Sequence, residues 1–329
     1  MKDYKVITSR VRLARNFADV KFPSRATAEE ARFVAEKVYL AGKSVTQGRL
    51  YAMEELDDSE RSYLVERRLI SPALASAPYG AAFLSKDKRL SVMCMEEDHV
   101  RVQSFLPGLS LRECFEIVKE YDLALRTHAR LAFDKKLGYL TACPTNVGTG
   151  MRASVMMFLP GITALGKVDE LEEELKKANL TIRGALGEGS QAEGFLYQIS
   201  NGVSLGVSED TILNRVESAA ERIIKIEDAM LDAYYKRDKI RLEDTIYRSY
   251  AILKAARTLS EKELASLVVN LKIGVLLGLI ELGSVNADEL VMMCSPLGIV
   301  RNTHCADTPA ERDVARAAFV RKILNEKEG

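Results

Sequence analysis

Strand-like patterns occupy only the first two hundred or so residues of this 329-residue chain. Four short apolar runs there are typical of strands, at 90–94, 100–105, 139–143 and 195–199. After Ser208 such runs nearly vanish, and a long helical pattern continues to about Leu259. The chain is therefore expected to combine an α+β part with an all-helical part, and its length is sufficient for two domains.

Helix starts are indicated where Ser, Thr or Asn precedes an acidic residue by three positions, the pattern of a capping box. This pattern occurs at 27–30 and 110–113 in the first part, and at 260–263, 286–289 and 308–311 in the second. Residues 234–238 interrupt the apolar period of the long helical segment. We place the domain boundary there and predict domains at 1–236 and 237–329.

The charge balance limits the classes of partner. The chain has 47 basic and 47 acidic residues, which argues against a protein that coats nucleic acid or an anionic membrane. The longest uncharged stretch, 153–166, holds 14 residues, whereas a spanning helix needs about 20 apolar ones. Met1 is followed by charged residues, and the five cysteines form no C-x-x-C pair. We expect a cytoplasmic protein with reduced thiols and no nucleic-acid or membrane partner.

Several familiar motifs fail. The segment 161–167 reads G-x-x-x-x-G-K, but Val168 cannot supply the metal-binding hydroxyl of a P-loop, so we expect a structural loop. The Gly187-x-Gly189 pair has Glu188 and Glu193 close to where phosphates would lie. The three histidines have no paired spacing, and no metal site held by the protein is predicted.

Arginines stand beside glycines or in uncharged settings. In Ser9-Arg10-Val11-Arg12 the period of two places both guanidinium groups on one side of a strand. Arg152 follows a glycine-rich turn, and Arg183 directly precedes Gly184. Such forks bind phosphate oxygens bidentately. A single arginine of this kind is more typical of a solvated surface group, but several together favour an anion site.

Acidic residues and a cysteine could complement the arginines. Glu96-Glu97-Asp98 follows the strand-like run 90–94, and Glu188 lies in the glycine-rich segment 183–194, which suits a flap over a site. Cys143 precedes a rigid Pro-Thr-Asn turn, where nearby arginines would favour the thiolate. The alternatives are an acidic turn, a hairpin connection and an inert buried cysteine.

Taken together, these segments resemble the phosphagen (guanidino) kinase family, whose members move the γ-phosphoryl group of ATP onto a guanidinium nitrogen. The matching motifs are S-R-V-R at 9–12, E-E-D-H-V-R at 96–101, C-P-T-N-V-G-T-G-M-R-A-S at 143–154, R-G-A-L-G-E at 183–188 and Q-I-S-N at 198–201. The resemblance implies a guanido kinase/glutamine synthetase-like catalytic domain, an antiparallel sheet flanked by helices. It also implies ATP and Mg²⁺ as cofactors.

The resemblance assigns roles to individual residues. It implies that the nucleotide phosphates are held by Arg10, Arg12, Arg101, Arg152 and Arg183. Glu97 and Glu188 would grip the substrate guanidinium, with Cys143 against the same group. Further nucleotide contacts are expected at Thr8, Ser9, Val11, Arg68, Ala153, Ser154, Val155, Met156, Gly184, Ala185, Leu186, Gly187 and Glu188. The chain departs from the family at Met95, where relatives usually have asparagine, and at Arg68, where they have histidine.

Within the family, the chain resembles the bacterial protein-arginine kinases. Its S-R-V-R segment begins at residue 9, whereas kinases of small metabolites carry a helical domain first. Residues 312–317 match the R-D-x-x-R-A phosphoarginine-binding motif of those bacterial enzymes, with Arg312, Asp313, Arg316 and Ala317 as the implied binding residues. A helix starting near Thr308 would put both arginines on one face near its positive end.

That resemblance implies protein substrates with accessible arginines, a homodimer, a possible activator protein, and marking of products for a Clp-type chaperone or protease. Two alternatives remain open. A free-arginine kinase would use the same chemistry on a small substrate, and an inactive scaffold that binds phosphoarginine would keep Arg312 and Arg316 without needing the carboxylates.

Overall fold

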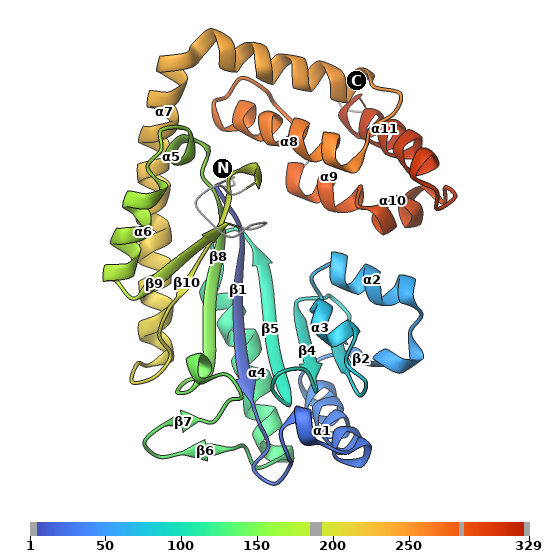
Figure 1. Cartoon of the computed structure of the whole chain (residues 1–329), viewed down its shortest axis with the longest axis vertical. Helices are drawn as coiled ribbons and strands as arrows, with labels where there is room; N and C mark the ends of the chain where they lie inside the picture. Colours follow the sequence, from blue (N-terminus) through green and yellow to red (C-terminus); the bar gives the residue numbers. More distant parts are fainter. Residues whose placement is uncertain (1–4, 185–192, 283–285, 326–329) are drawn as a thin grey trace. The chain divides into compact units, whose positions relative to one another are not determined.

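The computed structural model describes residues 5–184, 193–282 and 286–325 (Figure 1). The chain falls into two compact units. Unit 1 takes the described residues within 1–157, 169–185 and 197–224, and unit 2 takes those within 158–168, 186–196 and 225–329. No described helix is both long and apolar enough to cross a bilayer.

Unit 1 is built on one sheet. In the described part of the chain its eight strands run in the order β2-β3-β4-β5-β1-β8-β10-β9. Their bounds are β1 Val6–Arg15, β2 Gly48–Ala52, β3 Ala81–Ser85, β4 Leu90–Cys94, β5 Val100–Pro107, β8 Met151–Phe158, β9 Leu180–Gly184 and β10 Leu196–Asn201. The central strand β1 pairs antiparallel with both β5 and β8. The expected antiparallel sheet is confirmed, and its order brings segments from both ends of the unit to the centre.

One face of the sheet is covered by α1 (Ala28–Val45) and α4 (Leu111–His128), which pack on each other and on the strands. Apolar residues of β1 alternate toward this face, so Val11 and Leu13 are fully buried. Thr27 caps α1 with the predicted capping box. The same prediction at Ser110 is wrong, because its hydroxyl donates to the carbonyl of Pro107 and makes no side-chain cap.

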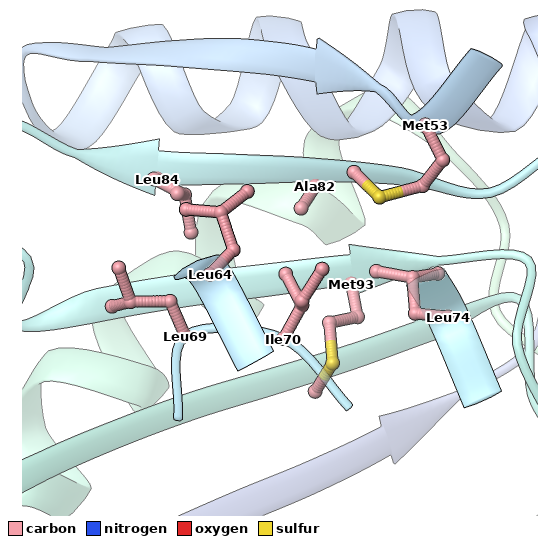
Figure 2. Close-up of a cluster of buried hydrophobic side chains, with 8 residues drawn as sticks. All are labelled: Met53, Leu64, Leu69, Ile70, Leu74, Ala82, Leu84 and Met93. Atoms are coloured by element: carbon pink, nitrogen blue, oxygen red, sulfur yellow. The ribbon is translucent and has the colours of Figure 1, made fainter. Parts of the chain in front are cut away.

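The other face is only partly covered. Over β3 and β4 it packs against α2 (Asp58–Glu66) and α3 (Pro72–Ala75) through a cluster of buried apolar side chains (Figure 2). The cluster contains Met53, Leu64, Leu69, Ile70, Leu74, Ala82, Leu84 and Met93. Gln103 on β5 ties the α2–α3 connection to the sheet by donating to the carbonyls of Arg68 and Leu69 at 3.2 and 3.3 Å. Beyond β5 this face carries polar residues.

The remaining elements of unit 1 are short hairpins and turns, with α6 (Val168–Lys177) and the start of α7. The strand predicted at 139–143 is wrong beyond its first residue, because only Phe133–Asp134 (β6) pairs with Gly138–Tyr139 (β7). The chain from Cys143 instead enters a 3₁₀ turn at Pro144–Asn146. Proline at the first position of that turn cannot donate to a strand ladder.

Unit 2 is helical. It contains α5 (Pro160–Ala164), the later part of α7 (Glu209–Ala255), α8 (Glu261–Leu276), α9 (Ala287–Met293), α10 (Pro296–Thr303) and α11 (Pro309–Asn325). Residues 161–164, expected to be a loop, form the short helix α5, whose first N–H groups donate to the buried carboxylate of Glu227. Helix α7 departs from helical dihedral angles at Asp238, within the segment where the apolar period is interrupted.

Candidate active site

The strand register places four of the predicted arginines on the partly open face of the sheet. Residues directly opposite one another in an antiparallel pair point to the same face. Arg12 on β1 lies opposite Arg152 on β8, and Arg10 shares its face by the period of two. Arg101 on β5 lies opposite Ala14 of β1, which is again in phase with Arg12. These four form the arginine row of the site.

Two further arginines flank this row. The Arg152 guanidinium donates to Ser200 Oγ at 3.0 Å, and Ser200 lies opposite Thr181 on β9. Arg183 is two residues beyond Thr181 and therefore on the same face. Arg68 follows α2 with a positive φ of 57°, and its charge acts on Arg10. The row and its two neighbours come from strands and loops far apart in the sequence.

The arginines repel one another. Burial lowers the pKa of Arg10 to about 10, and the charges of Arg68, Arg152 and Arg101 add to this effect. Burial, followed by the charges of Arg10, Arg101 and Arg152, holds the pKa of Arg12 well below its usual range. Within the part of the chain that is described, Nε of Arg152 is buried without a hydrogen-bond partner. Such excess positive charge, with an unsatisfied donor, fits a site for a polyanion.

Two glutamates contact Arg101. Glu96 is almost buried, lies 2.8 Å from Arg101 Nη1, and accepts a hydrogen bond of 2.8 Å from Ser71 Oγ. The Glu97 side chain is 46% exposed, and one of its carboxylate oxygens lies 3.4 Å from Arg101 Nη2. Glu96 is therefore the internal counter-ion of the arginine row. Glu97 is held weakly and stays available to a second cation.

The rest of the predicted acidic segment is structural. Asp98 accepts hydrogen bonds from Asn16 Nδ2 at 2.6 Å and from the Ala142 N–H at 2.7 Å. His99 accepts from the Phe17 N–H at Nδ1 and donates from Nε2 to the carbonyl of Lys21. Burial lowers the pKa of His99, which favours this neutral ring. These bonds fix the loop that presents Glu97.

A cleft of about 180 Å³ joins these groups, and every lining residue belongs to unit 1. Its lining consists of Arg12, Ala14, Glu97, Arg101, Cys143, Thr145, Asn146, Gly150 and Arg152. The Cys143 sulfur lies 3.0 Å from Thr145 Oγ1. It is also near Arg152, whose pKa is lowered by burial and by the charge of Arg183 and raised by Cys143. The cleft thus brings a carboxylate, a thiol and three arginines together. Thr145 and Asn146 were not predicted as site residues, although they lie in the C-P-T-N motif.

The side chains of four predicted nucleotide contacts point away from the arginine row. Ser9, Val11, Ala153 and Val155 are fully buried or nearly so on the helix-covered face, because they alternate with the arginine row. Ser9 Oγ instead donates to the carbonyl of Gly108 and accepts from the Ser110 N–H. A nucleotide contact at these four positions would therefore involve the backbone and not the side chain. Ser154, opposite Arg10, lies in the arginine phase, as do Thr8 and Met156, which pair with each other.

The glycine-rich segment is only partly described. Gly184 ends β9 opposite Tyr197. The other residues predicted there, Ala185, Leu186, Gly187 and Glu188, lie outside the described residues. The second of the two expected carboxylates therefore has no position relative to Glu97.

The R-D-x-x-R-A segment lies on α11 in unit 2. Arg316 is 1% exposed, against expectation, and donates to the carbonyls of Cys294 at 2.9 Å and Leu259 at 2.7 Å as well as to Asp313. Ala317 is also buried. Arg312 remains at the surface, paired with Asp307. Of these two arginines, four positions apart, only Arg316 is buried, and its bonds to the carbonyls of Leu259 and Cys294 help to hold the unit together.

The arginine row, the carboxylate and the thiol of the cleft are features of one class of enzyme. The chain belongs to the ATP:guanido phosphotransferase family: residues 32–230 match the model of that family's C-terminal catalytic domain. Solved structures agree in fold. A lombricine kinase superposes with a TM-score of 0.62 at 25% identity, covering 70% of this chain and 68% of that one. The duplicated taurocyamine kinase from Schistosoma mansoni, with bound transition state analog components, gives 0.64 at 26% identity over 72% of this chain and 35% of that longer one.

Full-length relatives are more specific. Residues 239–329 match the model of the protein-arginine kinase McsB C-terminal domain. A protein-arginine kinase from Caldanaerobacter subterraneus is 39% identical over 98% of both chains. The protein-arginine kinase of Bacillus subtilis is 38% identical over 97% of this chain and 90% of its own.

Proposed function

We propose that this chain is an ATP-dependent protein-arginine kinase that transfers the γ-phosphoryl group of ATP to arginine side chains of proteins. The observation that carries the proposal is the cleft in which the arginine row meets Glu97 and Cys143. The arginines suit a triphosphate, and the carboxylate suits the cationic acceptor. The catalytic-domain match and the full-length relatives support the same reaction class.

The acceptor sets the chemical problem. A guanidinium has a pKa above about 12 and no free lone pair, so it is a poor nucleophile until its charge and orientation are managed. We assign Glu97 to bind it, orient one nitrogen toward the γ-phosphorus and accept the released proton. Glu188 would supply the second carboxylate, and Cys143 would contact the same group. The N–P bond forms as the bond between the β–γ bridging oxygen and the γ-phosphorus breaks.

The arginine row would hold the nucleotide. The site is surrounded by Arg10, Arg12, Arg101 and Arg152. Their positive charge exceeds the negative charge of Glu96 and Glu97. Arginine forks in a partly buried site stabilise charge on a transferring phosphoryl group. Arg68 and Arg183 flank the row. Mg²⁺ would arrive on the nucleotide phosphates and keep several of its waters. Bound in this way, Mg²⁺ would neutralise part of the phosphate charge.

We assign phosphoarginine recognition to the surface of α11, with Arg312 and Asp313 as contacting residues. Arg312 would exchange Asp307 for the phosphoryl group, and Asp313 would pair with the guanidinium. Arg316 and Ala317 would act by fixing the helix. The boundary near residue 236, a homodimer, an activator protein, a cytoplasmic location and marking of products for a Clp-type protease complete the proposal by analogy with the family.

The direct test uses purified full-length protein, Mg-ATP and an unfolded arginine-rich protein. Mass spectrometry under non-acidic conditions, which preserve the N–P bond, is expected to find phosphoarginine on the protein. A parallel reaction with free arginine separates this proposal from a phosphagen kinase. Phosphorylation of free arginine alone would refute the protein-kinase assignment, and absence of both products with phosphoarginine binding intact would favour a scaffold.

A further inference from the structure

The segment 143–150, here called the cysteine loop, provides four residues of the cleft lining, namely Cys143, Thr145, Asn146 and Gly150. Unlike the arginines, it is not part of the main sheet. Its regular structure is one 3₁₀ turn at Pro144–Asn146 and an isolated bridge between Gly148 and Tyr139. Its shape must therefore be fixed by side chains from elsewhere.

Ser204 holds the loop from one side. It is 3% exposed, and its hydroxyl oxygen lies 2.8 Å from the carbonyl oxygens of both Thr145 and Val147. The hydroxyl has one proton, which these two carbonyls share. The carbonyl of Ser204 in turn accepts from the Thr149 N–H at 3.1 Å. One residue thus satisfies groups at three positions of the loop.

The contact between this residue and the loop is tight. Gly148 has a φ of +113°, and a Cβ at this position would lie 2.3 Å from the carbonyl oxygen of Ser204. Glycine is required at position 148 by the positive φ and by the close approach of the backbone at Ser204. A side chain at position 148 would therefore push the loop away from Ser204.

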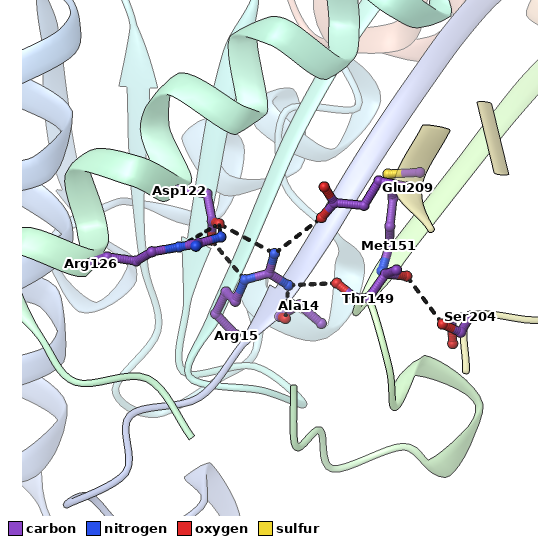
Figure 3. Close-up of polar contacts among 8 residues, drawn as sticks. All are labelled: Ala14, Arg15, Asp122, Arg126, Thr149, Met151, Ser204 and Glu209. Atoms are coloured by element: carbon purple, nitrogen blue, oxygen red, sulfur yellow. Dashed lines mark hydrogen bonds and ion pairs between the residues drawn. The ribbon is translucent and has the colours of Figure 1, made fainter. Parts of the chain in front are cut away.

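Arg15 holds the loop from the other side (Figure 3). Its Nη1 donates to the carbonyls of Thr149 and Ala14, each at 2.9 Å, which joins the loop to β1. The side chain is 0% exposed. It is fixed by Asp122 at 2.7 Å and by the ring of Tyr139, whose centroid lies 3.6 Å away, with Glu209 at 3.9 Å. Arg15 is thus a buried clamp and not a member of the arginine row.

We propose that Ser204 and Arg15 are positioning residues that set the cysteine loop against the arginine row. The inference deepens the proposed function and rests on it. The two halves of the site then have separate supports, because the row is held by strand pairing and the loop by these two side chains. Disturbing the loop should therefore slow the chemical step and leave ATP binding nearly unchanged.

The first test is Ser204→Ala in the full-length protein. Misplacing a reacting group by about 1 Å costs on the order of a hundredfold in rate, and we expect kcat to fall by roughly ten- to a hundredfold. KM for ATP should stay within about twofold. The matched control is Ser85→Ala, since Ser85 is equally buried and ties the β3–β4 turn by bonds to Asp87 and Leu90. That variant should keep the wild-type kcat.

The second test reads the loop directly, without ATP turnover. In a Cys305→Ser background, Cys143 is the remaining partly exposed cysteine among the described residues. Its rate of alkylation by iodoacetamide, followed by mass spectrometry, should rise several-fold when Ser204→Ala is added and stay unchanged with Ser85→Ala. Arg15→Lys keeps a cation between Asp122 and Glu209 but loses the fork, and it should give the same pattern.

Wild-type values of both kcat and the alkylation rate in Ser204→Ala would overturn the proposal. Equal losses in Ser204→Ala and Ser85→Ala would also overturn it, because they would indicate a general loss of stability. If the wild type phosphorylates no arginine, the proposed function fails by itself. The alkylation rates then still decide whether Ser204 and Arg15 fix the loop.

Discussion

Replacing Arg10 by methionine is expected to stabilise the ligand-free protein while removing its affinity for ATP. Arg10 lies in the arginine row, where burial and then the charges of three neighbouring arginines lower its pKa to about 10. Near neutral pH the side chain is charged in both the folded and the unfolded chain. The lowered pKa therefore means that the charge destabilises the folded state, and Met keeps the length of the side chain without that charge.

The size of the effect follows from the pKa. The lowering of the Arg10 pKa to about 10 corresponds to roughly 3 kcal/mol of unfolding free energy. Because the side chain is not fully buried, solvent screening reduces this to about 1–2 kcal/mol. For a protein of this size each kcal/mol moves Tm by about 2–4 °C. We expect Arg10→Met to raise Tm by roughly 2–8 °C in the absence of nucleotide.

Differential scanning calorimetry with and without Mg-ATP measures both effects. Wild type should gain thermal stability on adding Mg-ATP, because ligand binding to the folded state raises Tm, and Arg10→Met should gain little. The control is Arg15→Met on the same strand but the opposite face. Arg15 is paired with buried Asp122, and breaking such a pair costs about 3–5 kcal/mol. If Arg10→Met lowers Tm as Arg15→Met does, the repulsion argument is wrong.

Glu97→Gln should lower kcat by about a hundred- to ten-thousandfold with Tm nearly unchanged, since the side chain is 46% exposed and only loosely paired with Arg101; steady-state kinetics with normal turnover would remove it from the mechanism. Arg312→Ala should weaken phosphoarginine binding by calorimetry at least about tenfold, whereas Val314→Ala, at an exposed position on the same helix, should not; equal affinities would disprove the assignment. Burial lowers the pKa of His99, so the unfolded chain takes up the proton first and the unfolding free energy should fall as pH drops below about 6.5; urea titrations should show a flatter pH profile for His99→Gln.

Local periodicity predicted the part of the site that a single strand determines. The period of two in 9–12 placed Arg10 and Arg12 on one face, and the pairing of Arg12 with Arg152 confirms it. The same rule puts Arg15, at an odd distance from Arg12, on the opposite face, where it meets Asp122. What periodicity could not give is the strand order, since pairing β1 with β8 joins residues about 140 positions apart.

Burial of a helix face is equally invisible to spacing. Arg316 lies four positions after Arg312, which fixes their common face but not what covers it. In unit 2 the carbonyls of Leu259 and Cys294 lie beneath Arg316 and accept its donors. Sequence spacing therefore overestimated the number of arginines available to a phosphoryl group on α11, and the tertiary contacts corrected it.

The two departures from the family pattern, Arg68 and Met95, have a common backbone explanation. Both have positive φ, 57° and 60°, a region in which asparagine and histidine are several-fold enriched among non-glycine residues. These are the residue types that the family resemblance implies at the two positions. Here the backbone is held by the bonds Arg68 N–H to Val65 and Met95 N–H to His99, so the conformation persists at a cost of order 1 kcal/mol. Both departures therefore affect the stability of the local backbone. Glu97, two residues after Met95, still lines the cleft.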